Sequence, residues 1–600
     1  MSWLPPLLVA IPLLAGAAIA GGDHVTPTPI QQAVAVAAAA ATAALSALLL
    51  IHVESVEVVH WFGGWKPRGG IALGVDFAVD PFAAGMCLAA AVVVLLALVY
   101  SLTYMKEEAR IVDALFLSAL GAMCGFAMSG DLFNLFVWLE LMGVSAFALT
   151  GFQARKLGPV QGAVNFAIVT TVGSFLLVLG IGFVYARTGA LNLAQAGEAL
   201  KGKPDGLVIV AMTLVLCGFL VKGAVAPFHL WAADAYAVAP GPVCAVLGGA
   251  MTDIGLFGVA RSWWTVFSAP FHGHAAGDVL LWLGIVSALL GAVMALLQRH
   301  LKRLLAYSVI AHIGVMLAGI GMLEGKALAG SALVFVSHAF LTAALFLVAG
   351  LLLLDEGTID ELRLYGRGRA GLGAIWLAAT IGLVGAPYVG IYLGHGLIDE
   401  AAAHAHREWI PPLLWLSSAL VGAALLRAGG RIFLGRGDRA DPLLGRELDE
   451  DPVTRDALRP LLVGATWVAL ALGVVVSVVP GIDRRVEHAA DRFRDRTEYA
   501  GAVLHGTPIA PMPSLPFEVA HSSTETVLYA AGAVLLAFLL ALVGLYRERL
   551  AGGVASFPAR LLAPPVAALK ALHSGVVGDY VTWVVVGTAA VGGAWALLLR

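Results

Sequence analysis

Charged side chains are scarce in this sequence. Only 12% of its 600 residues are charged, whereas 60% are hydrophobic. A soluble domain carries about 25% charged residues, so this chain has too few of them to cover a water-exposed surface. The mean hydropathy of +0.90 points the same way. The composition excludes a string of soluble domains and predicts a membrane protein with many spanning segments.

Cysteines are few, and nucleotide-binding motifs are absent. The four cysteines lie far apart in apolar runs, which excludes a disulfide framework and the spacing of an iron–sulfur centre. The sequence has no Walker A loop, no GxSxG and no GxGxxG after a strand pattern. We therefore expect no cofactor and no resident metal. His404 and His406 are spaced like a metal-binding pair, but a solvated turn is favoured there. The net charge of −3 shows no basic bias, so no nucleic-acid partner is expected.

Sixteen apolar runs have the length of a membrane-spanning helix, which needs about 20 residues. They predict an all-α fold: a polytopic membrane protein of about 14–16 transmembrane helices. The second run follows the first closely, which favours a spanning helix over a cleaved signal peptide at the N-terminus. Lys and Arg in the short loops weakly favour both termini outside. The runs cover residues 3–20, 32–52, 79–103, 112–129, 131–152, 162–186, 207–230, 242–267, 278–297, 303–323, 327–354, 371–400, 409–435, 460–480, 526–546 and 577–599.

Two polar stretches interrupt this pattern towards the C-terminus. Residues 436–459 are dense in charges of both signs, and residues 481–525 combine charge with several prolines, so both predict polar loops. Residues 547–575 mix apolar and basic residues, which is typical of a segment lying along the membrane surface. These stretches separate two terminal spans from the fourteen before them.

Two spans carry glycine and proline near their centres. The segments are Lys222-Gly-Ala-Val-Ala-Pro227 and Gly382-Leu-Val-Gly-Ala-Pro387, in spans five apart in order. Helices broken at corresponding positions of two halves are typical of an ion pathway in an inverted-repeat transporter. The simpler alternative is a proline kink in each helix. Charged residues accompany both segments, which favours the pathway.

Glu140 and Lys222 are charged residues inside apolar spans. An ionisable group at the bilayer centre costs at least about 2.5–3.5 kcal/mol, so each requires a reason. Neither has an oppositely charged neighbour in sequence, so we expect a Glu–Lys pair between helices, in which weakening the pair releases a proton from the lysine. The alternative is a static structural ion pair.

Further ionisable residues lie in other spans. Asp253, His312 and His338 could form a proton relay, because histidine can pass protons through its two ring nitrogens. A satisfied core histidine is the alternative for each. His395 and Asp399, four residues apart on one helix face, are candidates for the end of the path, against a solvated loop histidine. Further accessory candidates are Asp131, which also suits the positive end of a helix dipole, His229 and Asp234, both after the first proline, and Lys302.

Four segments, in order, resemble the proton-conducting membrane transporter family. This family includes the antiporter-like subunits of respiratory complex I, the A and D subunits of Mrp-type cation/proton antiporters, and membrane subunits of energy-converting hydrogenases. The resemblance covers roughly residues 60–435 and includes the loop at 63–82. The segments are SGDLFNLFVWLELMGVSAFAL (129–149), VKGAVAPFHLWAADAYAVAPGPVCAVLGG (221–249), LKRLLAYSVIAHIGVMLAGIG (301–321) and SHAFLTAALFLVAG (337–350).

The resemblance implies two inverted five-helix repeats containing broken helices, with a polar axis across the middle of the membrane. Glu140 matches the family's key glutamate, Lys222 its first-half lysine, and His312 and His338 commonly polar positions on the axis. The expected divisions of the chain are N-terminal transmembrane helices (1–110), an antiporter-like core with the inverted repeats (111–435), a core-terminal helix with polar loops (436–525), and a C-terminal helix, an amphipathic segment and a last transmembrane helix (526–600).

Three positions depart from the family pattern. Asp253 stands where a lysine or histidine is usual, Thr342 replaces another lysine, and the lysine of the second broken helix aligns with Gly394. His395 is one position further on, about 100° round the helix. The residues that usually continue the path after Lys222 are therefore changed.

These observations support three hypotheses. The first is a proton-translocating subunit of a multi-subunit, Mrp-like cation/proton antiporter in the cell membrane, with other membrane subunits as partners and protons and sodium as ions. The second is a membrane subunit of a hydrogenase-like or quinone-linked respiratory complex, in which an enzyme elsewhere drives this chain. The third is a partly degenerate scaffold or half-channel partner in inorganic-carbon uptake. We favour the first.

Overall fold

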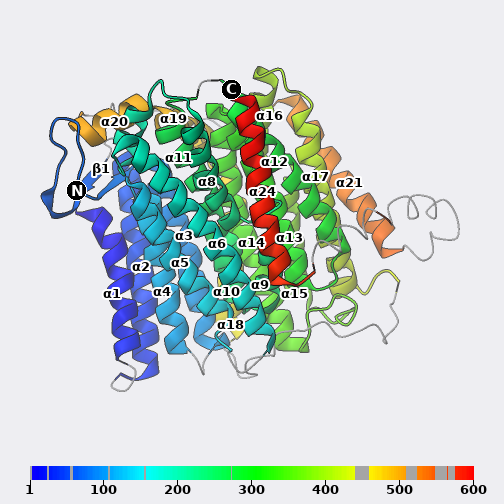
Figure 1. The fold of residues 1–600 in the computed structure, drawn as a ribbon. Coiled ribbons are helices and arrows are strands. Elements are labelled where there is room, and N and C mark those ends of the chain that lie inside the picture. Colours follow the sequence, from blue (N-terminus) through cyan, green and yellow to red (C-terminus); the bar gives the residue numbers. More distant parts are fainter. Residues whose placement is uncertain are drawn as a thin grey trace.

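A computed structural model describes residues 3–22, 26–54, 58–105, 109–153, 157–271, 273–438, 459–507, 523–546, 564 and 574–599. Two of the basic loop residues counted for the orientation, Arg155 and Lys156, lie outside the described residues. So do most of the two polar stretches (439–458 and 508–522) and, apart from residue 564, the predicted surface segment at 547–573. The chain forms a broad bundle of helices (Figure 1).

The helices have the following bounds: α1 Leu4–Gly21, α2 Thr28–Val53, α3 Pro81–Tyr104, α4 Ala109–Met128, α5 Leu132–Thr150, α6 Leu157–Thr188, α7 Leu193–Leu200, α8 Gly206–Lys222, α9 Leu230–Val238, α10 Gly241–Val246, α11 Thr252–Ser262, α12 Ala275–Leu297, α13 Leu301–Gly321, α14 Gly325–Glu356, α15 Ala370–Val384, α16 Tyr392–His404, α17 Ile410–Leu434, α18 Arg459–Val475, α19 Ile482–Arg494, α20 Arg496–His505, α21 Thr524–Leu545 and α24 Val577–Leu598. Short 3-10 turns occupy Phe62–Gly64 (η1) and Val476–Val478 (η4), and π-helical turns occupy Leu247–Met251 (η2) and Trp263–Phe267 (η3).

The predicted all-α membrane fold is confirmed. Fourteen helices in the described part of the chain are long and apolar enough to cross a membrane. Fourteen of the sixteen predicted spans correspond to them. The other two, at 207–230 and 371–400, are the broken helices: α8 with α9, and α15 with α16. The one sheet in the described residues is a hairpin of β1 (Val58–Trp61) and β2 (Asp76–Val79), paired antiparallel with Val58 opposite Val79.

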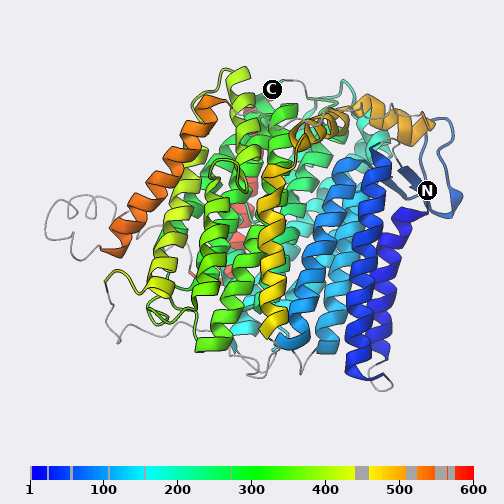
Figure 2. The same cartoon turned by 180° about the vertical axis from the view of Figure 1, so that it is seen from behind.

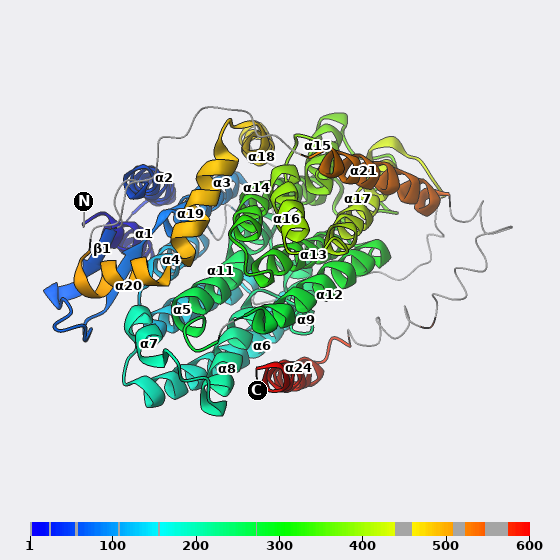
Figure 3. The same cartoon turned by 90° about the horizontal axis from the view of Figure 1, so that it is seen from above.

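The bundle has two distinct faces. Helix α1 begins and α24 ends on the upper side of Figure 1, and α19 and α20 lie across that side (Figures 1 and 3). We term it the α19 face. Seen from behind, α18 runs between the N-terminal helices and the central helices, in contact with α3 and α14 (Figure 2).

The two broken helices enter the membrane from opposite faces. Helix α8 runs inward from the α19 face and α15 from the opposite face, which is consistent with the inverted repeats that the resemblance implies (Figure 1). In the first break, which ends before α9, the Ala226 N–H donates to Ser287 Oγ of α12 (2.9 Å). In the second, Gly385 takes a left-handed φ of 78°, and Gly390 O accepts hydrogen bonds from Ser337 and Ser477. Side chains of neighbouring helices thus satisfy backbone groups freed inside the membrane.

The two terminal spans pack against the broken helices. Asp234 of α9 accepts a hydrogen bond from the Tyr580 hydroxyl of α24 (2.7 Å), and Asp399 of α16 accepts one from the Thr526 hydroxyl of α21 (3.4 Å). Figure 3 shows α24 and α21 on the outside of the bundle, at separate edges. Each terminal helix therefore contacts an acidic residue that follows one of the breaks.

A buried acidic cluster lies beside the β-hairpin, outside the spans. Asp76 is fully buried, and its Oδ1 accepts a hydrogen bond from Asn192 Nδ2 (2.9 Å). Asp131 lies nearby and caps α5 by accepting a hydrogen bond from the Asn134 N–H (2.9 Å). Burial, and then the charge of Asp131, raise the pKa of Asp76 to about 8.

This raised pKa makes a prediction for stability against pH. In the unfolded chain the pKa of an aspartate is about 3.9, so the folded state binds this proton more tightly. The stabilising contribution is complete below about pH 4 and is lost as the pH rises through about 8. We expect Asp76→Asn to melt at a higher temperature than the parent protein at pH 9 and at a similar temperature at pH 5, in detergent. An equal fall in melting temperature for both proteins would contradict this account.

Candidate functional site: a buried polar axis

Lys222 ends α8 at the first helix break. Its side chain is 3% exposed, and Nζ lies 5.4 Å from the centre of the Phe166 ring. A Cβ on Gly143 of α5 would lie 3.2 Å from Nζ, so glycine at this position leaves room for the ammonium group. The half-buried Glu140 is one turn earlier on α5.

The direct Glu140–Lys222 ion pair expected from the sequence is not formed. No ion pair within 4.0 Å joins the two side chains in the described structure. Lys222 packs instead against the Phe166 ring and the backbone at Gly143. The sequence locates both charges in the membrane but cannot give the distance between two helices.

Asp253 lies two residues after the π-helical turn η2, within a fully buried span. Such wide turns inside α-helices frequently occur at functional sites. The side chain is 2% exposed, and neither carboxylate oxygen has a hydrogen-bond partner among the described residues. Its Oδ2 lies 3.9 Å from Nδ1 of His338 on α14. On the same helix as Asp253, Gly255 packs directly against the backbone of Gly223 in the first break.

His338 and His312 continue the line from Asp253 to the second break. Their ring centres are 5.1 Å apart, and both side chains are buried. In His312, Nδ1 lies 2.8 Å from Ser308 O and Nε2 lies 3.0 Å from Leu383 O, at the end of α15. Carbonyl oxygens only accept hydrogen bonds, and a neutral imidazole carries one N–H. The site therefore accommodates a doubly protonated ring, whose two N–H groups can both donate.

His395 and Asp399 lie beyond the second break on α16. The His395 ring lies 4.4 Å from the Trp415 ring, and its Nε2 is 3.4 Å from Ser418 Oγ. Trp415 Nε1 donates to Asp399 Oδ2 (3.0 Å). One tryptophan of α17 therefore joins the two residues that the sequence places on one helix face.

Together these side chains form a line of buried groups between the two breaks and beyond the second. We term this line the buried axis. Its members are Lys222, Asp253, His338, His312, His395 and Asp399. In the described residues no group of three or more His, Cys, Asp or Glu side chains could hold a metal ion.

Comparison with known proteins supports the resemblance. The family model described as NADH:quinone oxidoreductase/Mrp antiporter, TM, matches residues 129–420, and the model for the complex I chain 5 N-terminus matches residues 65–112. NADH-quinone oxidoreductase subunit N of Desulforudis audaxviator is 33% identical over 354 residues, which is 58% of this chain and 69% of that protein. This chain belongs to the NADH:quinone oxidoreductase/Mrp antiporter family.

Two further proteins are similar to this chain. The D subunit of the Na(+)/H(+) antiporter of Bacillus subtilis is 28% identical over 381 residues, covering 62% of this chain and 75% of that protein. In the solved structure of an archaeal respiratory complex, the membrane-bound sulfane sulfur reductase, one chain matches with a TM-score of 0.73 and 21% identity, over 83% of this chain and 99% of that one. The fold is thus that of membrane subunits in larger complexes.

Close helix packing explains why Gly394 stands where the NADH:quinone oxidoreductase/Mrp antiporter pattern has a lysine. A Cβ at this position would lie 2.6 Å from Gly330 O and 2.7 Å from Val334 N, because α16 packs against the backbone of α14. A lysine side chain does not fit there. At the second departure, Thr342 is 2% exposed, and its hydroxyl has no hydrogen-bond partner within the described part of the chain.

The accessory candidates lie off the buried axis or at its end. Asp131 is a helix cap near the α19 face. His229 precedes α9, and Asp234 lies 3.7 Å from Arg303 as well as bonding Tyr580. Lys302 is fully buried and donates to Ala239 O at the end of α9 (2.7 Å). The contacts of Asp234 and Lys302 attach α9, the second half of the first broken helix, to α13 and α24.

Several polar neighbours of the buried axis were not predicted. They contact the helix breaks or His395 and Asp399, but in the sequence each is a single polar or aromatic residue in an apolar run, which is too weak a signal. They are Ser287, Ser308, Ser337, Trp415, Ser418, Ser477 and Thr526.

His312 should stabilise the second break. In His312→Leu, Leu383 O loses its donor, and leaving a buried acceptor unsatisfied costs about 1–3 kcal/mol. We expect a clear fall in the melting temperature of the purified protein in detergent. His395→Leu is the matched control, because this equally buried ring has a single long hydrogen-bond contact, with Ser418, and leucine can still pack against Trp415. Equal melting temperatures for the two variants would contradict this role.

Proposed function

We propose that this chain is a proton-translocating membrane subunit of a multi-subunit cation/proton antiporter of the Mrp type, located in the cell membrane. The observation that carries the proposal is the buried axis, which places acidic and basic side chains between two helix breaks inside the membrane. Such groups are costly in a bilayer and characteristically mark ion pathways. The likeness to the Na(+)/H(+) antiporter of Bacillus subtilis supports sodium as the coupled cation.

Protons would enter at the half-buried Glu140 and pass to Lys222. From there they would reach Asp253 past the first break, where Gly255 and Gly223 bring the two backbones into contact. The 3.9 Å between Asp253 and His338 exceeds a hydrogen bond, so transfer there requires a small side-chain movement or one bridging water.

His312 would hold the proton at the centre of the axis. Its two carbonyl neighbours can stabilise an imidazolium, while His338 lies against it within reach of the Asp253 charge. Movement of Leu383 at the end of α15 would change one of these two contacts. This links the protonation of His312 to the geometry of the second break and hence to His395 and Asp399.

A membrane subunit of a respiratory complex is the second candidate. It is favoured by the 33% identity to an NADH-quinone oxidoreductase subunit N, which is higher than the 28% identity to the antiporter of Bacillus subtilis. In that case an oxidoreductase elsewhere in the complex would drive the same axis. Gly394, which leaves no room for a lysine, favours a third reading, a scaffold or half-channel partner.

Lys222→Gln tests the proposed function. The substitution removes the charge that would pass protons between Glu140 and Asp253, so we expect proton flux in sealed vesicles containing the native complex to fall at least tenfold. Flux would be recorded with and without sodium, and co-purification of the partner subunits would show that the complex still assembles. The matched control is Lys203→Gln, an exposed lysine outside the spans, which should keep the parent flux. Flux that is absent in the parent complex, or unchanged in Lys222→Gln, would favour the scaffold.

A further inference from the structure

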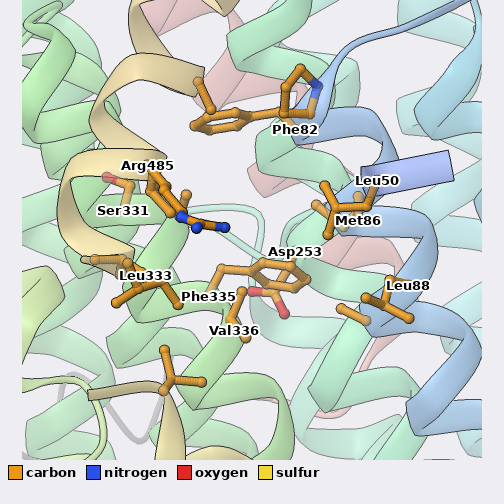
Figure 4. Close-up of a pocket in the computed structure, with 18 of the residues that line it drawn as sticks. Leu50, Phe82, Met86, Leu88, Asp253, Ser331, Leu333, Phe335, Val336 and Arg485 are labelled. Atoms are coloured by element: carbon orange, nitrogen blue, oxygen red, sulfur yellow. The ribbon is translucent and has the colours of Figure 1, made fainter. Parts of the chain in front are cut away.

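A cavity of about 590 Å³ lies between Asp253 and the α19 face. Its walls are mainly apolar side chains of α3, α11, α13, α14 and α18. Helix α19 covers it and contributes Arg485, whose guanidinium lies 3.7 Å from Glu54 at the end of α2. In Figure 4, Arg485 extends from α19 into the same space that Asp253 faces.

Asp253 is the buried carboxylate in this cavity, where Ser331 is a second buried polar residue of the wall. Its carboxylate is 2% exposed, and both oxygens lack a hydrogen-bond partner in the described residues. Burying such a group without a partner costs several kcal/mol even after the protein relaxes. The cavity wall around it is mainly apolar, and the Ser331 hydroxyl in that wall bonds backbone carbonyls of Met316 and Ala327. His338 lies 3.9 Å from the Asp253 carboxylate.

His338 also lacks hydrogen-bond partners. Neither of its ring nitrogens has a hydrogen-bond partner within the described structure, and the ring is fully buried. Asp253 lines the cavity, and the unsatisfied nitrogens of His338 lie next to it, with Nδ1 3.9 Å from the carboxylate. Water molecules can satisfy such atoms where two or more polar partners converge, as they do here.

We propose that this cavity is a second access route, through which water and protons pass between the α19 face and Asp253. The proposal rests on the proposed function and adds to it a connection that joins the buried axis before the second break. A chain with Gly394 in place of a lysine would then exchange protons with the α19 face at Asp253. The buried axis would then have two connections to the α19 face: one through the cavity at Asp253 and one through His395.

The apolar walls make this route a hydrophobic gate. Narrow apolar passages exclude water and block conduction until they widen. Arg485 lies at the mouth of the passage, where its ion pair with Glu54 holds the guanidinium in place. Movement of α19, which lies across the bundle surface, would displace Arg485 and open the passage (Figure 3).

Cysteine accessibility tests the route without measuring flux. Val336→Cys of α14 and Leu256→Cys of α11 would place a thiol in the cavity wall. The matched control is Val334→Cys, on the same helix as Val336 but packed against Gly394. All four native cysteines are buried, so the parent protein sets the background. Lys203→Cys marks the α19 face, because it is exposed in the loop between α7 and α8.

We expect a cationic, membrane-impermeant methanethiosulfonate to modify the two cavity cysteines slowly, during openings of the gate, in vesicles holding the native complex. The reagent should act from the side that modifies Lys203→Cys. The control at Val334 should not react. Adding Arg485→Ala should raise the rate of modification at Val336→Cys at least severalfold. Assembly of each variant would be verified by co-purification, and having two cavity cysteines guards against the misfolding of one.

Two results would overturn the proposal. The first is that an uncharged, membrane-permeant thiol reagent modifies the cavity cysteines whereas the charged reagent does not. This result would show that lipid tails, and not water, fill the cavity. The second is modification from the opposite face. If the cavity cysteines react as expected but the parent complex carries no proton flux, the access route stands and the proposed function fails.

Discussion

Backbone groups freed at the two helix breaks need hydrogen-bond partners inside the membrane, and one of the side chains that supply them, His312, belongs to the buried axis. Water is scarce at that depth, so neighbouring helices must provide the partners. Ser287 serves the first break, while Ser337, Ser477 and His312 serve the second. His312 therefore has two roles: it contacts the carbonyl of Leu383 and lies between His338 and the second break in the buried axis.

The same constraint explains how the outer helices are arranged. Asp234 and Asp399 follow the two breaks, and each is bonded by a hydroxyl from a terminal helix, Tyr580 of α24 or Thr526 of α21. The terminal spans thus support the broken helices from outside. Close packing has a cost at Gly394, where the contact between α16 and α14 leaves no space for a long side chain. We infer that the axis compensates by using Asp253 as its connection to the α19 face.

Much of the fold could be predicted from the sequence, because the length of apolar runs and the positions of Gly and Pro inside them are local signals. Both breaks fall at the predicted glycine–proline segments. The site was less predictable. Glu140 and Lys222 do not form the expected ion pair, since the distance between α5 and α8 depends on packing at Gly143. The wide turn before Asp253 and the cavity beside it arise from contacts between distant helices, which no local pattern records.

The central claim is that protons pass through Asp253 and His338. The most direct test is proton flux in vesicles carrying the native complex with Asp253→Asn, His338→Phe and both substitutions together. Lys203→Gln serves as a control, because this exposed lysine lies outside the spans. Residues acting in one path are not additive, so each single variant should reduce flux to background and the double variant should add no further loss. Parent-level flux in either single variant, with the complex assembled, would contradict the account.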